Sequence, residues 1–252
     1  MDFKFVLFFV QLAAVSRAHL IRIKNNCSFT VWPGIQGDPE HEHLQNGGFS
    51  LDAYKTHTFN TPRNWAGRIW GRTNCDSQGK CETGDCGNKI HCSGAGVVPP
   101  ATLAEMKFTR SDGLDFYQVS MLQGYNLPIR MMPTRYFTYT KKGKYDCKPA
   151  ECVPDLNSEC PFELAVGAAG GGSDVVACHS ACSQFNTDAY CCLGAYNSQS
   201  TCKISSWPQK YNPAYFKNAC PNARCHAFDA STSSFTCRGN AITKYDIIFC
   251  PY

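Results

Sequence analysis

Short runs of alternating apolar and polar residues recur along the chain and predict a protein built mainly from β-strands. Residues 20–24 alternate with a period of two, as a half-buried strand does. Turn residues separate such runs about every ten positions, a spacing typical of an all-β sandwich or flattened barrel. The predicted strands cover residues 20–24, 27–33, 49–51, 55–59, 67–73, 102–108, 115–122, 129–132, 135–140, 235–237 and 245–250.

One segment instead has helical spacing. Apolar or cysteine residues stand at positions 175, 178, 181, 182 and 185, which predicts a helix over residues 174–185 with Asp174 at its N-cap. Around it, residues 147–225 hold many cysteines, and we expect a second, loop-rich domain there. Residues 75–92 hold four cysteines with almost no apolar side chains between them, which favours a small lobe held by disulfides.

The first eighteen residues have the features of a secretory signal peptide. Lys4 precedes an apolar run over residues 5–15, and Ser16 and Ala18 stand at the minus-three and minus-one positions of a cleavage site. The run is too short to span a bilayer. We therefore expect residues 1–18 to be removed, His19 to become the first residue, and the protein to be secreted to the extracellular space.

The charge of the chain is mildly basic and adds little to this picture. The formal net charge is +4, and residues 1–18 carry Lys4, Arg17 and Asp2, so their removal leaves +3. No cluster of lysine and arginine marks a surface for nucleic acid or for a membrane. We expect neither partner.

The chain has 17 cysteines. Behind a signal peptide, that number indicates an oxidising compartment and a framework of disulfide bonds. Cys81, Cys86, His91 and Cys92 are zinc ligands by type, but their spacing lacks the paired short C-x-x-C clips of a zinc site. We expect no metal and no cofactor. An odd count leaves either one free thiol or one intermolecular bond.

Functional side chains are first expected in residues 113–128. Aromatic and β-branched residues predict a strand that ends in a turn at Gly124, shortly before Pro128. Gln118 and Gln123 lie among residues otherwise suited to a half-buried sheet. Because they are five apart, a flat strand places them on opposite faces, and they share a cleft only if the chain bends between them.

Several motifs together resemble the thaumatin-like proteins, the pathogenesis-related class five family. The string of cysteines is the most specific part, and the motifs extend over the whole chain after residue 18. They are CSFTVW at 27–32, RIWGRTNC at 68–75, CETGDC at 81–86, TLAE at 102–105, LDFY at 114–117, GYNLP at 124–128, CHSAC at 178–182, YCC at 190–192 and FCP at 249–251.

The resemblance implies a flattened β-sandwich with a disulfide-rich loop and helix domain and a small disulfide lobe. On this chain the sandwich takes residues 19–74, 93–146 and 226–252, the small lobe 75–92, and the loop and helix domain 147–225. Eight disulfides are also implied: Cys27–Cys250, Cys75–Cys81, Cys86–Cys92, Cys147–Cys237, Cys152–Cys220, Cys160–Cys178, Cys182–Cys191 and Cys192–Cys202. Cys225 is left over, as a buried free thiol or as a partner in an intermolecular bond.

The family is known for binding fungal cell-wall β-1,3-glucan in a cleft between the two larger domains, and some members hydrolyse it weakly. The motifs place Arg68, Glu105, Gln118, Gln123 and Asp229 in that cleft. The family has one arginine, one glutamate and three aspartates there, which sum to −3. With two glutamines in place of aspartates, this chain has one cation and two anions, which sum to −1.

This departure shapes the expected function. A glycosidase needs two carboxyl groups, and glutamine cannot ionise, so Glu105 and Asp229 remain as the candidate catalytic pair. Amides bind sugar hydroxyls well, and Phe116, Tyr117 and Tyr125 could offer flat faces to sugar rings, with core packing as the alternative for at least two of them. The sequence predicts a secreted antifungal defence protein that binds β-1,3-glucan with weak or no hydrolysis.

Other functions stay open at this point. One is a weak endo-β-1,3-glucanase that uses Glu105 as its acid, and another is a protein-binding inhibitor or receptor ligand. A third is a copper site, because an N-terminal histidine such as His19 can bind the metal through its amine and imidazole; a frayed terminus beside the first strand is the alternative. We expect a monomer unless Cys225 bridges two chains.

Overall fold

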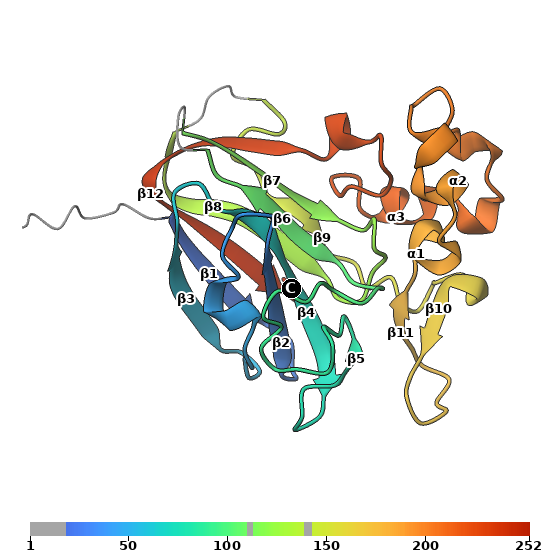
Figure 1. The fold of residues 1–252 in the computed structure, drawn as a ribbon, viewed down its shortest axis with the longest axis horizontal. Coiled ribbons are helices and arrows are strands. Elements are labelled where there is room, and N and C mark those ends of the chain that lie inside the picture. The colour runs from blue at the N-terminus through green and yellow to red at the C-terminus, as the bar shows by residue number, and fades with distance from the viewer. Residues whose placement is uncertain (1–18, 110–112, 139–142) are drawn as a thin grey trace, which may run out of the picture.

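The longest strand, β12 (Phe235–Phe249), belongs to both layers of a β-sandwich (Figure 1). The computed structural model describes residues 19–109, 113–138 and 143–252. The first part of β12 pairs with β7, and its second part pairs with β1 and β8. The pairing register shifts between Gly239 and Lys244, where the strand passes from one layer to the other. The prediction of a mainly β fold is confirmed.

The first layer runs in the order β2-β4-β6-β7, and the second in the order β3-β1-β12-β8-β9. A short β5 pairs with β4 in the small lobe. Apolar side chains of both layers meet between them, as Tyr117 and Tyr245 do with ring centroids 5.6 Å apart. The bounds are β1 His19–Asn25, β2 Val31–Gly37, β3 Thr56–Thr61, β4 Ala66–Cys75, β5 Cys81–Thr83, β6 Leu103–Lys107, β7 Leu114–Ser120, β8 Ile129–Thr138 and β9 Ala150–Cys152.

Some predicted strand boundaries are wrong. Residues 27–30 do not begin a strand, because the Asn25 side chain donates to the carbonyls of Phe29 and Leu51 and holds a turn there. Residues 49–51 contribute only an isolated bridge. The runs at 129–132 and 135–138 form one strand, and 139–140 lie outside the described residues. Pro133 is tolerated because β9 pairs only with the first three residues of β8, which leaves an open edge beyond them.

The helix predicted over residues 174–185 is wrong in its first half. The segment holds β11 (Val175–Cys178), which pairs with β10 (Ala165–Gly167), and then α1 (Ala181–Phe185). Cys178 exchanges two backbone hydrogen bonds with Tyr125, and these keep the first half extended. The N-cap is Ser180, not Asp174: its side chain accepts a hydrogen bond from the amide of Ser183.

The other helices are also short. Figure 1 shows α2 (Asp188–Cys191) and α3 (Ala214–Ala219) beside α1, apart from the large sheet. Single 3-10 turns lie at Leu44–Gly47, Phe162–Leu164, Gly194–Tyr196, Ile204–Ser206, Gln209–Tyr211 and Ala230–Thr232. Within the described ranges, no helix combines the length and the apolar character that crossing a membrane requires.

The eight disulfides in the structure are the same eight pairs that the family resemblance implies. Cys225 is free and buried, with 3% of its surface exposed. Burial raises the pKa of its thiol well above the ordinary value, and the nearby Asp229 raises it further. Such a thiol is protonated and inert at neutral pH, which favours the free cysteine over an intermolecular bond.

The small lobe is fixed to the first layer by Arg72 of β4, which is fully buried. Its guanidinium donates to the carbonyls of Trp32 over 3.0 Å and of Ile90 over 2.7 Å. Burial lowers the pKa of Arg72 to about 10, because the charge has left water, while Asp85 opposes that shift. Hydrogen bonds to carbonyls offset part of this cost. They also fix β4, the strand that carries Arg68.

Candidate functional site

Three of the predicted site residues lie in one row across neighbouring strands. Arg68 on β4 is directly opposite Glu105 on β6, and Glu105 is directly opposite Gln118 on β7. Neighbouring strands lie about 4.8 Å apart, and opposed residues point to the same face of a sheet. The three side chains therefore emerge side by side from a regular sheet, with no bend required.

Each residue of this row has a hydrogen-bond partner, and Glu105 and Gln118 are bonded to each other. Nε2 of Gln118 donates to Oε2 of Glu105 over 2.6 Å, and the hydroxyl of Ser234 donates to Oε1 of Gln118 over 3.4 Å. At the other end, the guanidinium of Arg68 donates to Oδ1 of Asp38 over 3.4 Å. The Gln118 amide thus has one partner on each side, which fixes its orientation.

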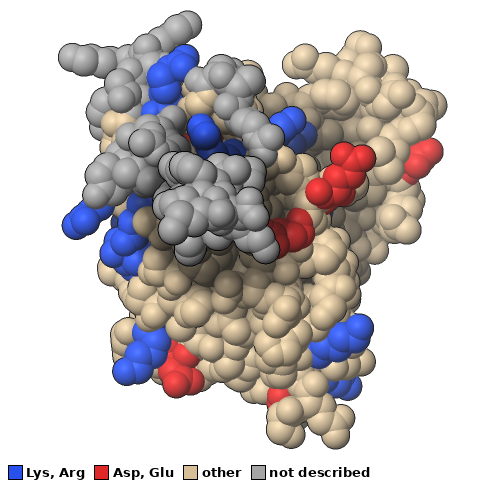
Figure 2. Space-filling model, turned by 60° about the vertical axis from the view of Figure 1, so that its left-hand side comes forward, with Lys and Arg blue, Asp and Glu red and all other residues tan. Residues whose placement is uncertain are grey.

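The row forms part of a groove with a volume of about 340 Å³. Its charged side chains are three cations and two anions, a sum of +1, so the groove is less acidic than the sequence comparison with the family suggests. On the face shown in Figure 2, acidic and basic side chains are scattered and form no patch of one sign. The groove is lined by Asp38, Gly67, Arg68, Glu105, Met106, Lys107, Phe116, Tyr117, Gln118, Arg224 and Ser234.

Of the three aromatic candidates, Phe116 is exposed at the groove, whereas the two tyrosines are buried. Phe116 lies two residues before Gln118, on the same face of β7, and is 40% exposed. Tyr117 points to the core, where its ring stacks on Phe235 with centroids 5.6 Å apart. Tyr125 is fully buried, and this burial raises the pKa of its phenol well above the ordinary value. Both tyrosine side chains take the core-packing alternative.

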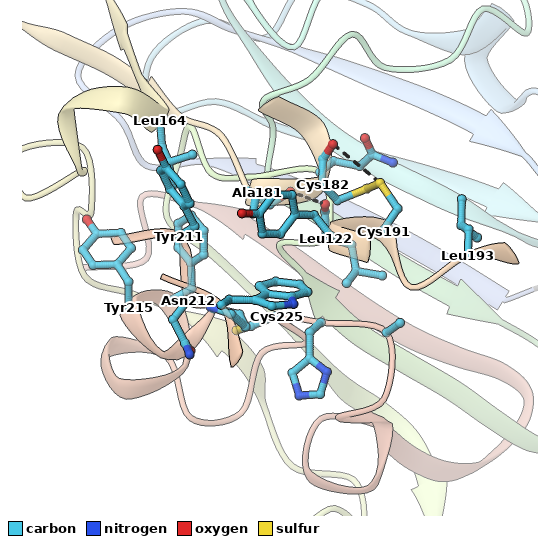
Figure 3. Close-up of a pocket in the computed structure, with 18 residues that line it drawn as sticks. Leu122, Leu164, Ala181, Cys182, Cys191, Leu193, Tyr211, Asn212, Tyr215 and Cys225 are labelled. Carbon is cyan, nitrogen blue, oxygen red and sulfur yellow. Dashed lines mark hydrogen bonds between the residues drawn. A yellow bond between two sulfur atoms is a disulfide. The ribbon is translucent and has the colours of Figure 1, made fainter. Parts of the chain in front are cut away.

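Gln123 does not share the groove with Gln118. It lies in the turn after β7, just before Gly124, whose positive φ of 95° suits a glycine. Gln123 lines a second, largely apolar pocket, whose other walls include Leu122 and Tyr211 (Figure 3). The turn therefore separates the two glutamines instead of bringing them together.

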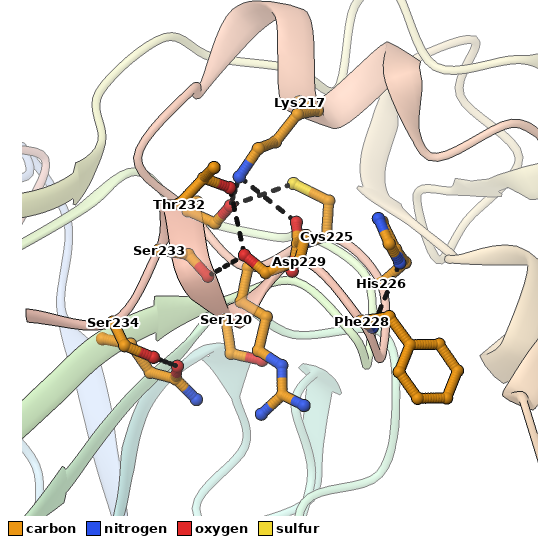
Figure 4. Close-up of polar contacts among 12 residues, drawn as sticks. Ser120, Lys217, Cys225, His226, Phe228, Asp229, Thr232, Ser233 and Ser234 are labelled. Carbon is orange, nitrogen blue, oxygen red and sulfur yellow. Dashed lines mark hydrogen bonds and ion pairs between the residues drawn. The ribbon is translucent and has the colours of Figure 1, made fainter. Parts of the chain in front are cut away.

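Asp229 is buried and does not line the groove. Its Oδ2 lies 3.2 Å from Nζ of Lys217 and accepts a 2.9 Å hydrogen bond from the amide of Cys225 (Figure 4). Its backbone carbonyl accepts a hydrogen bond from the hydroxyl of Ser233. These contacts tie the turn after residue 225 to α3. Glu105 and Asp229, the candidate catalytic pair, are thus not brought together.

Some groove residues come from loops, and the sequence pattern does not predict them. Asp38 directly follows β2 and lies two residues after Gln36, which is opposite Arg68. Residues two apart in an extended chain point to the same face, so Asp38 lies on the face of Arg68. Arg224 reaches the groove because its segment forms a parallel bridge with Ser120 of β7. Alternation of apolar and polar residues predicts which face of a strand a side chain occupies, but it does not predict which segments lie beside that strand. It therefore could not identify Asp38 or Arg224 as groove residues.

His19, the candidate copper ligand, is buried. Its ring is 4% exposed and lies 4.2 Å from that of Phe108. Its Nε2 is 3.6 Å from Oδ1 of Asp115, too far for a hydrogen bond. In the described part of the chain, no group of three or more histidine, cysteine, aspartate or glutamate side chains is arranged to hold a metal ion.

Burial of His19 predicts a loss of stability in acid. It lowers the pKa of the imidazole from 6.5 to about 4. Below pH 6.5 the unfolded chain therefore binds a proton that the folded chain refuses, until the pH falls through 4. We expect this residue to remove up to about 1.4 kcal/mol of stability per pH unit within that window. Urea denaturation at pH 7, 6 and 5 should show a shallower dependence for His19→Leu; an unchanged slope contradicts the prediction.

Comparisons with known proteins give a consistent result. The model of the thaumatin family matches residues 25–251. A thaumatin-like protein of Arabidopsis thaliana is 42% identical over 252 residues, covering 98% of this chain and 96% of that protein. Pathogenesis-related thaumatin-like protein 3.5 of Cryptomeria japonica is 44% identical over 238 residues, covering 93% and 90%. A Prunus avium protein named glucan endo-1,3-beta-glucosidase is 40% identical over 241 residues, covering 94% and 92%.

Proposed function

Because this chain belongs to the thaumatin family, we propose that it is a secreted defence protein whose groove binds β-1,3-glucan with weak or no hydrolysis. The observation that carries the proposal is the row of Arg68, Glu105 and Gln118, which are opposed across three strands at the groove, with a hydrogen bond between Gln118 and Glu105. The name of the Prunus avium relative supports the choice of glucan as the polysaccharide.

The row suits the binding of sugar hydroxyls. A charged guanidinium, a carboxylate and an amide offer both donors and acceptors along one line of the sheet. Phe116, exposed beside Gln118, adds an apolar surface against which the face of a sugar ring can pack. Binding of a neutral polymer needs this mixture of polar and apolar contacts and does not need an acidic groove.

Hydrolysis needs more than this site offers. The two carboxylates at the groove are Glu105 and Asp38. An oxygen of Glu105 accepts the Gln118 amide, and an oxygen of Asp38 accepts the guanidinium of Arg68. Each carboxylate is held through one of its two oxygens by a neighbouring donor, an arrangement that suits an acceptor of sugar hydroxyls. We therefore assign both carboxylates to binding.

A binding measurement with a matched pair of variants tests the groove. The chain should sediment with insoluble β-1,3-glucan, and Gln118→Ala should weaken binding about tenfold, because it removes an amide that bonds the sugar and orients Glu105. Gln123→Ala removes the same amide from the other pocket and should bind as the unaltered chain does. Equal losses in both variants, or no binding by the unaltered chain, contradict the proposal.

The second part of the proposal, that hydrolysis is weak or absent, is tested by measuring the release of reducing ends from laminarin. We expect little or none. A turnover rate equal to that of a dedicated glucanase, abolished by Glu105→Gln, would show that the groove is an active site and would overturn this half of the proposal. The binding result would stand, since the two measurements are independent.

A further inference from the structure

The apolar pocket that receives Gln123 is separate from the groove. The segment after α3 divides them: Arg224 lines the groove, whereas Cys225 and His226 line the pocket. The pocket has a volume of about 240 Å³. Most of its remaining walls come from the disulfide-rich part of the chain, including α1, α2, the 3-10 turn Gln209–Tyr211 and α3.

Aromatic rings form much of the wall of this pocket. Tyr190, Trp207, Tyr211 and Tyr215 line it, and Figure 3 shows Tyr211 and Tyr215 together on one side. The ring of Tyr190 meets that of Trp207 at 5.0 Å and 84°, an edge-to-face arrangement that is favourable and holds both rings in place. The wall is therefore preorganised for another planar ring.

Two features keep the pocket open and accessible. Cys182 and Cys191 line it and are bonded to each other, so the backbone on that side cannot collapse inward. Leu193, next to Cys191 and away from Tyr211 and Tyr215 in Figure 3, is 56% exposed. An exposed leucine beside an aromatic hollow gives an apolar compound a route in from water.

The size and polarity of the pocket define its ligand. A cavity of about 150 Å³ lined by apolar side chains binds benzene, so this larger one has room for two fused rings. Nδ1 of His226 accepts the amide of Phe228, which places the ring proton on Nε2. Burial lowers the pKa of His226, so the ring is neutral at neutral pH. Within the described residues, neither Nε2 of His226 nor the side chain of Gln123 makes a hydrogen bond.

We propose that this pocket binds a small neutral aromatic compound of one or two rings that carries one hydroxyl group. The rings pack between the aromatic side chains, and the hydroxyl pairs with Gln123. We expect a sugar to fit less well, because each of its several hydroxyls needs a partner when it leaves water and the lining of the pocket is largely apolar. A charged compound finds no free countercharge among the lining residues.

Titration calorimetry of the full chain with 2-naphthol and with naphthalene tests this. We expect one saturable site for 2-naphthol, weakened about tenfold in Trp207→Ala, which removes one aromatic wall. Gln123→Leu keeps the shape of the side chain and removes the amide. This variant should lower the affinity for 2-naphthol about fivefold and leave the affinity for naphthalene unchanged, because only 2-naphthol has a hydroxyl that can bond the amide. Gln118→Leu, in the groove, is the matched control and should change neither.

Several results would overturn this proposal. They are the absence of saturable 2-naphthol binding, unchanged affinity in Trp207→Ala, an equal effect of Gln123→Leu on both compounds, and displacement of 2-naphthol by a β-1,3-gluco-oligosaccharide. Sedimentation with insoluble glucan reports on the groove alone. A negative calorimetry result therefore leaves the proposed glucan binding unaffected, and a negative sedimentation result leaves the proposed aromatic site unaffected.

Discussion

Replacing Cys27 and Cys250 together by alanine is expected to lower the free energy of unfolding by about 5 kcal/mol. The bond joins residues 223 positions apart, and the entropy that a cross-link removes from the unfolded chain grows with the logarithm of the loop it closes. Cys147–Cys237 already shortens this loop, but residues 27–147 and 237–250 still lie within it, so the loss stays at about 4–5 kcal/mol. Guanidinium denaturation without reductant measures it.

A second double variant provides the control. Cys75 and Cys81 are only 6 positions apart, and removing their bond should cost about 2 kcal/mol by the same relation. The long bond also holds the end of β1 close to that of β12, where the two strands pair in parallel, whereas the short one lies within the small lobe. Equal losses for the two pairs would show that loop length does not govern the contribution of these bonds.

The parts of the fold that could be predicted are those in which apolar and polar residues repeat with a regular period. Residues 20–24 alternate cleanly, and β1 has alternating burial along its whole length. Strands of three residues, such as β5, β9 and β10, are too short to show any period and were not predicted. The helix over residues 174–185 was overpredicted because Cys178 counted as an apolar position, whereas its side chain is fixed by a disulfide and its backbone by Tyr125.

The site divides in the same way. Arg68, Glu105 and Gln118 could be named from their motifs, but their alignment in one row follows from strand register, which a single sequence does not contain. Gln123 is grouped with them by the resemblance and by the bend expected after Gln118, and Asp229 by the resemblance alone. A turn moves the first to another pocket, and burial removes the second from the groove. Long-range pairing, not residue type, decides which polar side chains meet.

Lys217→Met is expected to destabilise the protein by about 3 kcal/mol, because it leaves the carboxylate of Asp229 buried without its cation. Nζ of Lys217 is 3.2 Å from Oδ2 of Asp229 and also donates to the carbonyl of Ala223 over 2.9 Å. Methionine fills the same volume and supplies neither contact. Urea denaturation at neutral pH measures the loss.

A second substitution, added to Lys217→Met, shows whether the unpaired charge of Asp229 causes the loss of stability. Asp229→Asn removes the buried charge and keeps an oxygen that can accept the amide of Cys225. The double variant should therefore be more stable than Lys217→Met alone, and the two substitutions should be strongly non-additive. A double variant that is less stable by the sum of both losses contradicts this account.

The double variant with Lys217→Met and Asp229→Asn also tests whether Asp229 has a structural role or acts as a catalytic acid. The carboxylate lies outside the groove, so the refolded double variant should sediment with insoluble glucan as well as the unaltered chain does. A loss of glucan binding at full folding would place Asp229 in the site. Retained binding with altered stability would instead mean that its charge fixes the turn from which Arg224 reaches the groove and Cys225 the pocket.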